Sequence, residues 1–191
     1  MGTTNDVWVF VEHSDGAPKK VALELATKAR ALAAALGGQT AAVAFGAGAA
    51  ATAAKLGAYG AAKLYAAEDA AFDNYFVTPH SKVLADLVRE KQPKLVLFGS
   101  TPNGKDIAAR LAAKLELGLI VNATDVNMEN GQLVALKPAF GGSINVNSAF
   151  VEGRTTVLLM RPNAIAPEQS GEGAASVEQV AAGLSDSVGT H

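Results

Sequence analysis

Short apolar runs and longer segments of helical periodicity alternate along roughly the first two thirds of the chain. Within each run nearly all consecutive positions are apolar, which is the pattern of a parallel strand that is buried on both faces. The four runs are residues 7–12, 40–45, 63–66 and 95–98. The segments between the runs carry apolar residues three and four positions apart, so the pattern predicts repeated βα units.

The ends of the predicted helices are marked by capping and breaking residues. The first helix is expected to begin near Pro18 and to stop at residues 37–38, which are both glycine. A later helix is expected to have Thr78 as its cap and Pro79 in its first turn, and Pro93 closes it. Right-handed crossovers between the strands then predict a layered α/β/α fold with a mostly parallel sheet.

The pattern changes after Gly118. Four extended segments follow, at residues 119–128, 132–140, 143–151 and 155–160. Short turns join them: Asn130-Gly131 is a strong hairpin signal, and residues 152–154 are expected to form the last turn. We therefore expect antiparallel strands towards the C-terminus, which extend one edge of the parallel sheet or cover it as a ribbon.

From Ala166 onward Pro, Glu, Gln, Ser and Gly dominate, and no apolar period continues. A segment of this composition buries little apolar surface. We expect residues 1–165 to form one domain and residues 166–191 to be a flexible, disordered tail unless a partner or a further domain holds it.

Composition narrows the classes of function. The 191 residues are enough for one domain with a proper core, and 16 Lys and Arg against 18 Asp and Glu give a net charge of −2, so nucleic acid is not an expected partner. The lack of cysteine excludes disulfides, thiolate metal sites and thiol nucleophiles, and it fits a reducing compartment. With neither an apolar run of spanning length nor a signal-peptide layout, we expect a soluble protein of the bacterial cytoplasm with no membrane insertion.

The turn after residues 95–98 is the first candidate for chemistry. Residues 99–106 satisfy the letters of a phosphate-binding loop, GxxxxGK, but Asp106 stands where such a loop needs a Ser or Thr for magnesium. Pro102 also removes one N–H donor, so an NTPase is disfavoured. A tight βα turn and a weak anion site at the helix N-terminus both remain open. A nucleotide or anion pocket here would use Glu12, Gly99, Ser100, Gly104 and Lys105.

A second candidate is the small-residue stretch at residues 46–51. It matches the GxGxxA form of a dinucleotide fingerprint, and Glu68 and Asp69 follow about 20 residues later. The match follows the second strand rather than the first and arises easily in a chain with 19 glycines, so the start of a helix built from small residues is the favoured interpretation.

Other residues that draw attention favour structural roles. His13 follows Glu12 at the end of the first strand, a position suited to a ligand, an interface or a turn, and the turn role is favoured because no second metal-ligating histidine or nucleophile lies nearby in sequence. His80 is expected in an exposed first helical turn, and Trp8 in the core.

Taken together, the order and spacing of these motifs resemble the N-terminal domain of the alpha subunit of electron-transfer flavoprotein. The resemblance rests on an aliphatic strand ending in Val11-Glu12-His13, a helix over residues 19–32, the Gly104-Lys105-Asp106 turn and a closing strand ending in Met160-Arg161-Pro162. It covers about residues 6–165.

The resemblance implies an adenine nucleotide alpha hydrolase-like α/β/α fold and a role as scaffold. The parent protein would pair with a beta subunit, carry FAD, and pass electrons from acyl-CoA dehydrogenases of fatty acid beta-oxidation and related dehydrogenases to a membrane quinone reductase. No Ser-Gly-Gly-Arg-Gly type motif of the family's FAD-binding second domain occurs in residues 166–191. We therefore expect no catalytic residue, no metal and no cofactor bound to this chain alone, and an electron-carrier subunit rather than an enzyme.

Two other classes are kept as alternatives. A free-standing nucleotide-binding module of the universal-stress type would share the layered fold, but residues 99–106 lack its usual Gly-x-x-Gly run followed by Gly-Ser or Gly-Thr. An NTPase would depend on the incomplete phosphate-loop match at residues 99–106, and a dehydrogenase on the weak dinucleotide-fingerprint match at residues 46–51.

Overall fold

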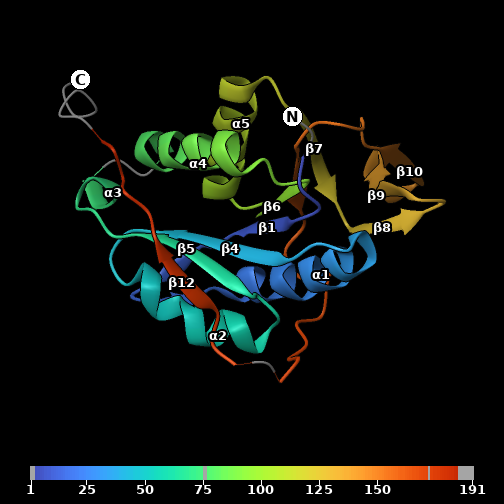
Figure 1. Cartoon of the computed structure of the whole chain (residues 1–191). Helices are drawn as coiled ribbons and strands as arrows, with labels where there is room; N and C mark the ends of the chain where they lie inside the picture. The colour runs from blue at the N-terminus through green and yellow to red at the C-terminus, as the bar shows by residue number, and fades with distance from the viewer. Residues whose placement is uncertain (1–2, 75–76, 172, 185–191) are drawn as a thin grey trace.

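The computed structural model describes residues 3–74, 77–171 and 173–184 (Figure 1). Its centre is a seven-stranded sheet in the order β12-β5-β4-β1-β6-β11-β7, and every neighbouring pair is parallel. The strands are β1 (Val7–Phe10), β4 (Thr40–Phe45), β5 (Lys63–Ala67), β6 (Leu95–Gly99), β7 (Gly118–Ala123), β11 (Thr156–Met160) and β12 (Ser176–Gln179). All residues of β1, β4, β6 and β11 are buried, which explains the consecutive apolar runs.

Helices cover both faces of this sheet (Figure 1). On one face lie α1 (Lys20–Leu36) and the short α2 (Ala53–Ala58), which follows the 3-10 turn η1 (Ala49–Thr52). On the other face lie α4 (Val77–Lys91) and α5 (Pro102–Leu115), with the short α3 (Ala71–Asn74) before them. Each face has its own apolar core, so the predicted layered α/β/α fold is confirmed.

A small antiparallel sheet projects at the opposite side of the molecule from β12 (Figure 1). This sheet, here called the ribbon, consists of β8 (Asp125–Glu129), β9 (Gln132–Ala139) and β10 (Ile144–Ala149), with the 3-10 turn η2 (Phe140–Gly142) between the last two. The predicted hairpin at Asn130-Gly131 is confirmed: both residues have positive φ, and the flanking Glu129 and Gln132 are paired.

The order of strands in this region differs from the prediction in two ways. The segment at residues 119–128 divides at Thr124, whose N–H donates to the Leu136 carbonyl, so β7 joins the central sheet and β8 joins the ribbon. Residues 152–154 are not a hairpin turn, because β11 does not pair with β10. Instead β11 runs between β6 and β7, parallel to both. Its five buried residues show why it occupies a central position in the sheet.

The expectation of disorder after Ala166 is wrong for most of that segment. We call residues 163–184, other than residue 172, the strap. The strap crosses α1 and α2, and its strand β12 then pairs with the edge strand β5. The Ser170, Ala175 and Val180 N–H groups donate to backbone carbonyls of the domain. The strap is held mainly by main-chain hydrogen bonds, which need no apolar periodicity in the sequence.

Two smaller expectations about α4 are also wrong. The helix begins at Val77, so Thr78 lies within its first turn and is not its cap. His80 is 3% exposed rather than at the surface, and it packs edge-on against Phe10, Phe45 and Phe72. Trp8 is buried, as predicted.

Candidate functional site

The carboxyl ends of β1 and β6 mark the point where the chain path diverges. These strands are neighbours in the sheet, yet the crossover after β1 leads through α1 to β4, and the one after β6 leads through α5 in the opposite direction. Ligands of open parallel sheets bind at such a switch point. The residues that follow the two strands, Glu12 and Thr101, are therefore the place to look for a site.

Thr101 links the two strand ends through its hydroxyl. The hydroxyl accepts a hydrogen bond from the Gly104 N–H at 2.9 Å, as an N-cap of α5 does, and donates to Glu12 Oε1 at 2.5 Å. The other carboxylate oxygen of Glu12, Oε2, accepts from Lys19 Nζ at 3.2 Å. The buried Glu12 carboxylate is thus satisfied within the chain, and it bridges β1 to the start of α5.

The N-terminus of α5 is poorly suited to bind an anion. Pro102 has no N–H, the Gly104 N–H is bonded to the Thr101 hydroxyl, and the Lys105 N–H is bonded to the Thr101 carbonyl. A Cβ on Gly104 would lie only 2.1 Å from the Gly99 carbonyl oxygen. The glycine of the GxxxxGK match is therefore required for close packing of α5 on β6, and the tight-turn interpretation is the better supported of the two.

A cavity of about 310 Å³ lies beside this bridge, at the carboxyl ends of β1 and β4. Here it is called the β1–β4 cavity. One wall is the β2–β3 hairpin, made of β2 (His13–Ser14) and β3 (Ala17–Pro18). Its lining consists of Phe10, Val11, Glu12, His13, Asp15, Lys19, Phe45, Gly46, Ala47, Phe72, His80 and Asn103.

The five predicted pocket residues do not converge on one site. Glu12 lines the β1–β4 cavity, and Gly99 and Gly104 are buried where α5 meets β6. Ser100 and Lys105 line a different, largely apolar cavity between α5 and β7. The sequence analysis named His13 beside Glu12 as a position suited to a ligand but favoured a turn role for it. It did not place His80 or Asn103 near Glu12, because both come from other segments of the chain.

The dinucleotide fingerprint at residues 46–51 also fails on geometry. Glu68, which that interpretation would place on a ribose hydroxyl, accepts a hydrogen bond from the Ala50 N–H at 2.9 Å. A carboxylate of the chain itself therefore occupies the helix start where a pyrophosphate would bind. The small-residue helix start is the better interpretation, since Gly48 and Gly16 pack their backbones against each other.

Groups with shifted pKa values lie away from both cavities. A hydrogen bond from Lys63 lowers the pKa of the Glu178 carboxyl on β12, and the same pairing raises the pKa of Lys63. At the base of the ribbon, burial acts to raise the pKa of Asp125, but hydrogen bonds from Lys28 and Asn127 outweigh it and lower the pKa. These shifts arise from structural ion pairs rather than from an acid or base poised for catalysis.

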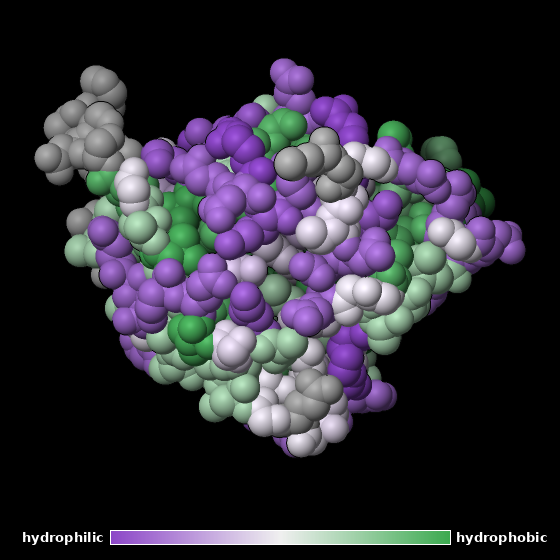
Figure 2. All heavy atoms as spheres, viewed as in Figure 1, coloured by the Kyte–Doolittle hydropathy of each residue, from purple (hydrophilic) through white to green (hydrophobic). Residues whose placement is uncertain are grey.

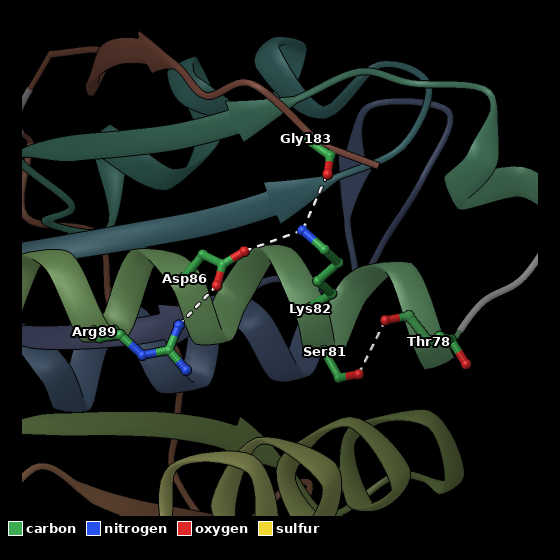
Figure 3. A network of polar contacts seen from close by, with 6 residues as sticks. All are labelled: Thr78, Ser81, Lys82, Asp86, Arg89 and Gly183. Atoms are coloured by element: carbon green, nitrogen blue, oxygen red, sulfur yellow. Dashed lines mark hydrogen bonds and ion pairs between the residues drawn. The ribbon is translucent and has the colours of Figure 1, made fainter. Parts of the chain in front are cut away.

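The last residues of the strap are tied to α4 by a polar network (Figure 3). Lys82 Nζ donates to the Gly183 carbonyl at 3.0 Å and pairs with Asp86 at 3.2 Å, and Asp86 also accepts from Arg89. Among the described residues there is no cluster of His, Asp and Glu that could hold a metal ion. No helix within those residues is long and apolar enough to cross a membrane.

The ribbon carries the most exposed apolar side chains near β7. Phe140 is 82% exposed, and Ile144 and Val146 on β10 are also exposed. Hydrophobic surface is visible over the ribbon in Figure 2. Ile144 and Val146 alternate with asparagines along β10, so their side chains point to the same face of the ribbon. Ala135 on β9 lies on this face too, and it is fully buried. The apolar face of the ribbon therefore extends beyond the part that its own domain covers.

Comparison with known proteins agrees with these features. The model of the electron transfer flavoprotein domain matches residues 7–185. The electron transfer flavoprotein subunit alpha of Mycobacterium tuberculosis is 43% identical over 166 residues, which cover 85% of this chain and 49% of the relative. The corresponding subunit of Clostridium acetobutylicum is 33% identical over 158 residues, which cover 82% of this chain and 47% of the relative. Protein FixB of Rhizobium meliloti is 35% identical over 169 residues, which cover 86% of this chain and 48% of the relative. The chain spans about half the length of these relatives.

Proposed function

Because the chain belongs to the electron transfer flavoprotein domain family, we propose that it is the scaffold half of an alpha subunit and that it docks a beta subunit. The rest of the subunit would hold FAD, and the assembled protein would carry electrons from acyl-CoA and other dehydrogenases towards a quinone reductase. Chemistry would then reside in the flavin, and the protein would supply binding and orientation.

The described residues do not fit FAD itself. A dinucleotide needs free N–H groups for its pyrophosphate, and Thr101 takes up the Gly104 N–H at the start of α5 while Glu68 takes up the Ala50 N–H at the start of η1. The same occupied helix starts count against the universal-stress type of nucleotide-binding module, because that class also binds phosphates.

The observation that carries the docking proposal is the uncovered apolar face of the ribbon. Exposed aromatic and aliphatic residues in a contiguous patch mark interaction surfaces. Phe140, Ile144 and Val146 are exposed apolar residues at one end of the ribbon, where Lys137 lies opposite Val146, and the outer edge of β10 is unpaired in the described part of the chain. We commit to a beta subunit as the occupant, because the relatives that share this chain's sequence are themselves named as subunits alpha.

Co-purification with the beta subunit of the same organism tests this proposal. We expect capture by the wild-type chain and a loss of affinity of about tenfold or more for Phe140→Asp and Ile144→Lys, since a charge at the centre of an interface lacks a partner. Val177→Asp on β12 is the control, because Val177 is also an exposed apolar residue but lies at the opposite edge of the sheet.

Thermal melting shows whether each variant is folded. If wild-type chain fails to capture the beta subunit at micromolar concentration, the docking role is wrong. If Val177→Asp weakens capture as much as Phe140→Asp does, the docking surface is not the ribbon.

A further inference from the structure

The chain contains two Asn-Gly pairs, and the fold holds them in opposite ways. They are Asn103-Gly104 at the start of α5 and Asn130-Gly131 at the tip of the ribbon. An asparagine before a glycine loses its amide readily, because no side chain on the glycine hinders its backbone nitrogen from attacking the amide carbon. Since the dipeptide is the same at both places, the surrounding structure decides which asparagine reacts.

The pair at the start of α5 is held firmly. The Gly104 N–H donates to the Thr101 hydroxyl at 2.9 Å, and Gly104 itself is buried. A Cβ on Gly104 would lie 2.1 Å from the Gly99 carbonyl oxygen, so the backbone has no room to turn. Asn103 lies in the first turn of the helix, which fixes its backbone torsions. The nitrogen that would attack the Asn103 amide is therefore engaged and immobile.

The pair at the tip of the ribbon lacks each of these restraints. Asn130 and Gly131 are exposed and form the turn that the pairing of Glu129 with Gln132 closes. The Gly131 N–H donates to no described residue, and a Cβ on Gly131 would meet nothing within 4 Å. Asn130 has a φ of 50°, in the left-handed region that side chains disfavour. An exposed turn of this kind opens at little cost in free energy.

We propose that Asn130 is a site of spontaneous deamidation and that the fold protects Asn103 from the same reaction. The Gly131 nitrogen bonds to the Asn130 Cγ, the bond from Cγ to the amide nitrogen breaks, and ammonia leaves with the proton that the Gly131 nitrogen gives up. Water then opens the resulting succinimide ring. Attack at the side-chain carbonyl gives aspartate, and attack at the main-chain carbonyl gives isoaspartate.

The two products have different consequences for the ribbon. Aspartate adds a negative charge beside Glu129 and favours the same type of hairpin turn. Isoaspartate adds a methylene group to the main chain of a two-residue turn, so Glu129 and Gln132 lose their register. Strand pairing places Phe140 and Ile144 at the other end of the ribbon from this tip. The site is therefore independent of the proposed docking surface, and its test needs no partner subunit.

Incubation of the 191-residue chain at mildly alkaline pH, followed by peptide mapping with mass spectrometry, measures both sites in one sample. We expect the Asn130 amide to be lost about tenfold or more faster than the Asn103 amide, because Asn103 reacts only after α5 opens locally. In guanidinium chloride the two rates should become similar, since the fold then protects neither pair. Asn130→Gln should stay unmodified at the tip, because its longer side chain would have to close a six-membered ring.

Three results would contradict the proposal. Equal rates at Asn130 and Asn103 in the folded chain would show that the fold does not distinguish them. Loss of the Asn130 amide only in guanidinium chloride would mean that the turn protects this pair as well. A product that contains aspartate but no isoaspartate would indicate direct hydrolysis of the amide rather than attack by the Gly131 nitrogen.

Discussion

At the scale of single residues, the hydroxyl of Thr101 serves two partners. It caps α5 by accepting from Gly104 and satisfies the buried Glu12 by donating to its carboxylate. We predict that Thr101→Val lowers the free energy of unfolding by about 1–3 kcal/mol, because both the cap and a bond to a buried charge are lost. Thr101→Ser keeps the hydroxyl and should stay close to wild type.

Urea unfolding followed by the fluorescence of Trp8, the only tryptophan, measures this loss. Thr78→Val is the matched control, since the only hydrogen bond of the Thr78 hydroxyl to a described residue is an exposed one from Arg110. Equal effects of the two valine substitutions would show that the Thr101 bridge contributes nothing specific.

The sequence predicted some of these residues correctly and misassigned others for physical reasons. Trp8 and the turn at Gly104 follow from local pattern. The burial of His80 does not, because it depends on Phe10, Phe45 and Phe72, which reach it from three other segments. Likewise the letters GxxxxGK do not reveal that Gly104 is needed for its contact with the Gly99 carbonyl.

At the scale of elements, the strap depends on a close backbone approach at Gly57. A Cβ on Gly57 would lie 2.0 Å from the Gly173 carbonyl oxygen, so Gly57→Ala must push the strap away from α2. We predict faster hydrogen exchange at the β12 amides in Gly57→Ala, with β1 and β6 still protected. Gly173→Ala, whose added methyl meets nothing within 4 Å, should leave exchange unchanged.

If β12 amides exchange at the wild-type rate in Gly57→Ala, the strap is not held through α2. If β1 and β6 lose protection together with β12, the strap does not open independently of the core.

The ion pairs of β12 give the strap a pH dependence. The pKa of Glu178 is lowered in the folded state, so its contribution to stability is present above the unfolded value of 4.5 and is lost as pH falls through the folded pKa. Glu178 is partly exposed, and its pairs with Lys63 and Lys91 are each worth about 0.2–1 kcal/mol.

We predict that Glu178→Gln is less stable than wild type at pH 7 and that the difference disappears below the folded pKa of Glu178. Urea unfolding of both proteins at pH 7 and at stepwise lower pH measures this. A difference that stays constant down to pH 3 would mean that the Glu178 charge is not its cause.

The strands of the βα units in the first half of the chain were predicted well, whereas the pairing of later strands was predicted poorly. The buried runs that became β1, β4, β5 and β6 could be assigned from apolar pattern. The pairing of β11 could not, because an apolar segment of five residues fits equally well beside β10 or between β6 and β7. β12 could not be predicted from an apolar pattern, because it is an exposed edge strand that is held to β5 by main-chain hydrogen bonds.

At the scale of the whole molecule, the described residues place two surfaces at different parts of one rigid core. The uncovered ribbon lies beside β7, and the β1–β4 cavity lies at the carboxyl ends of central strands. The strap ends beside α4, to which Lys82 and Gly183 tie it. The ribbon face proposed for docking therefore lies apart from the β1–β4 cavity, whose lining includes no ribbon residue.

The late position of β12 in the chain also shapes how this protein folds during synthesis. β5 emerges from the ribosome well before Ser176–Gln179, the strand that covers its edge. Until then β5 presents an open edge, the kind of surface that recruits strands from other molecules. The nascent chain is therefore more prone to aggregate until Ser176–Gln179 has been translated and has paired with β5.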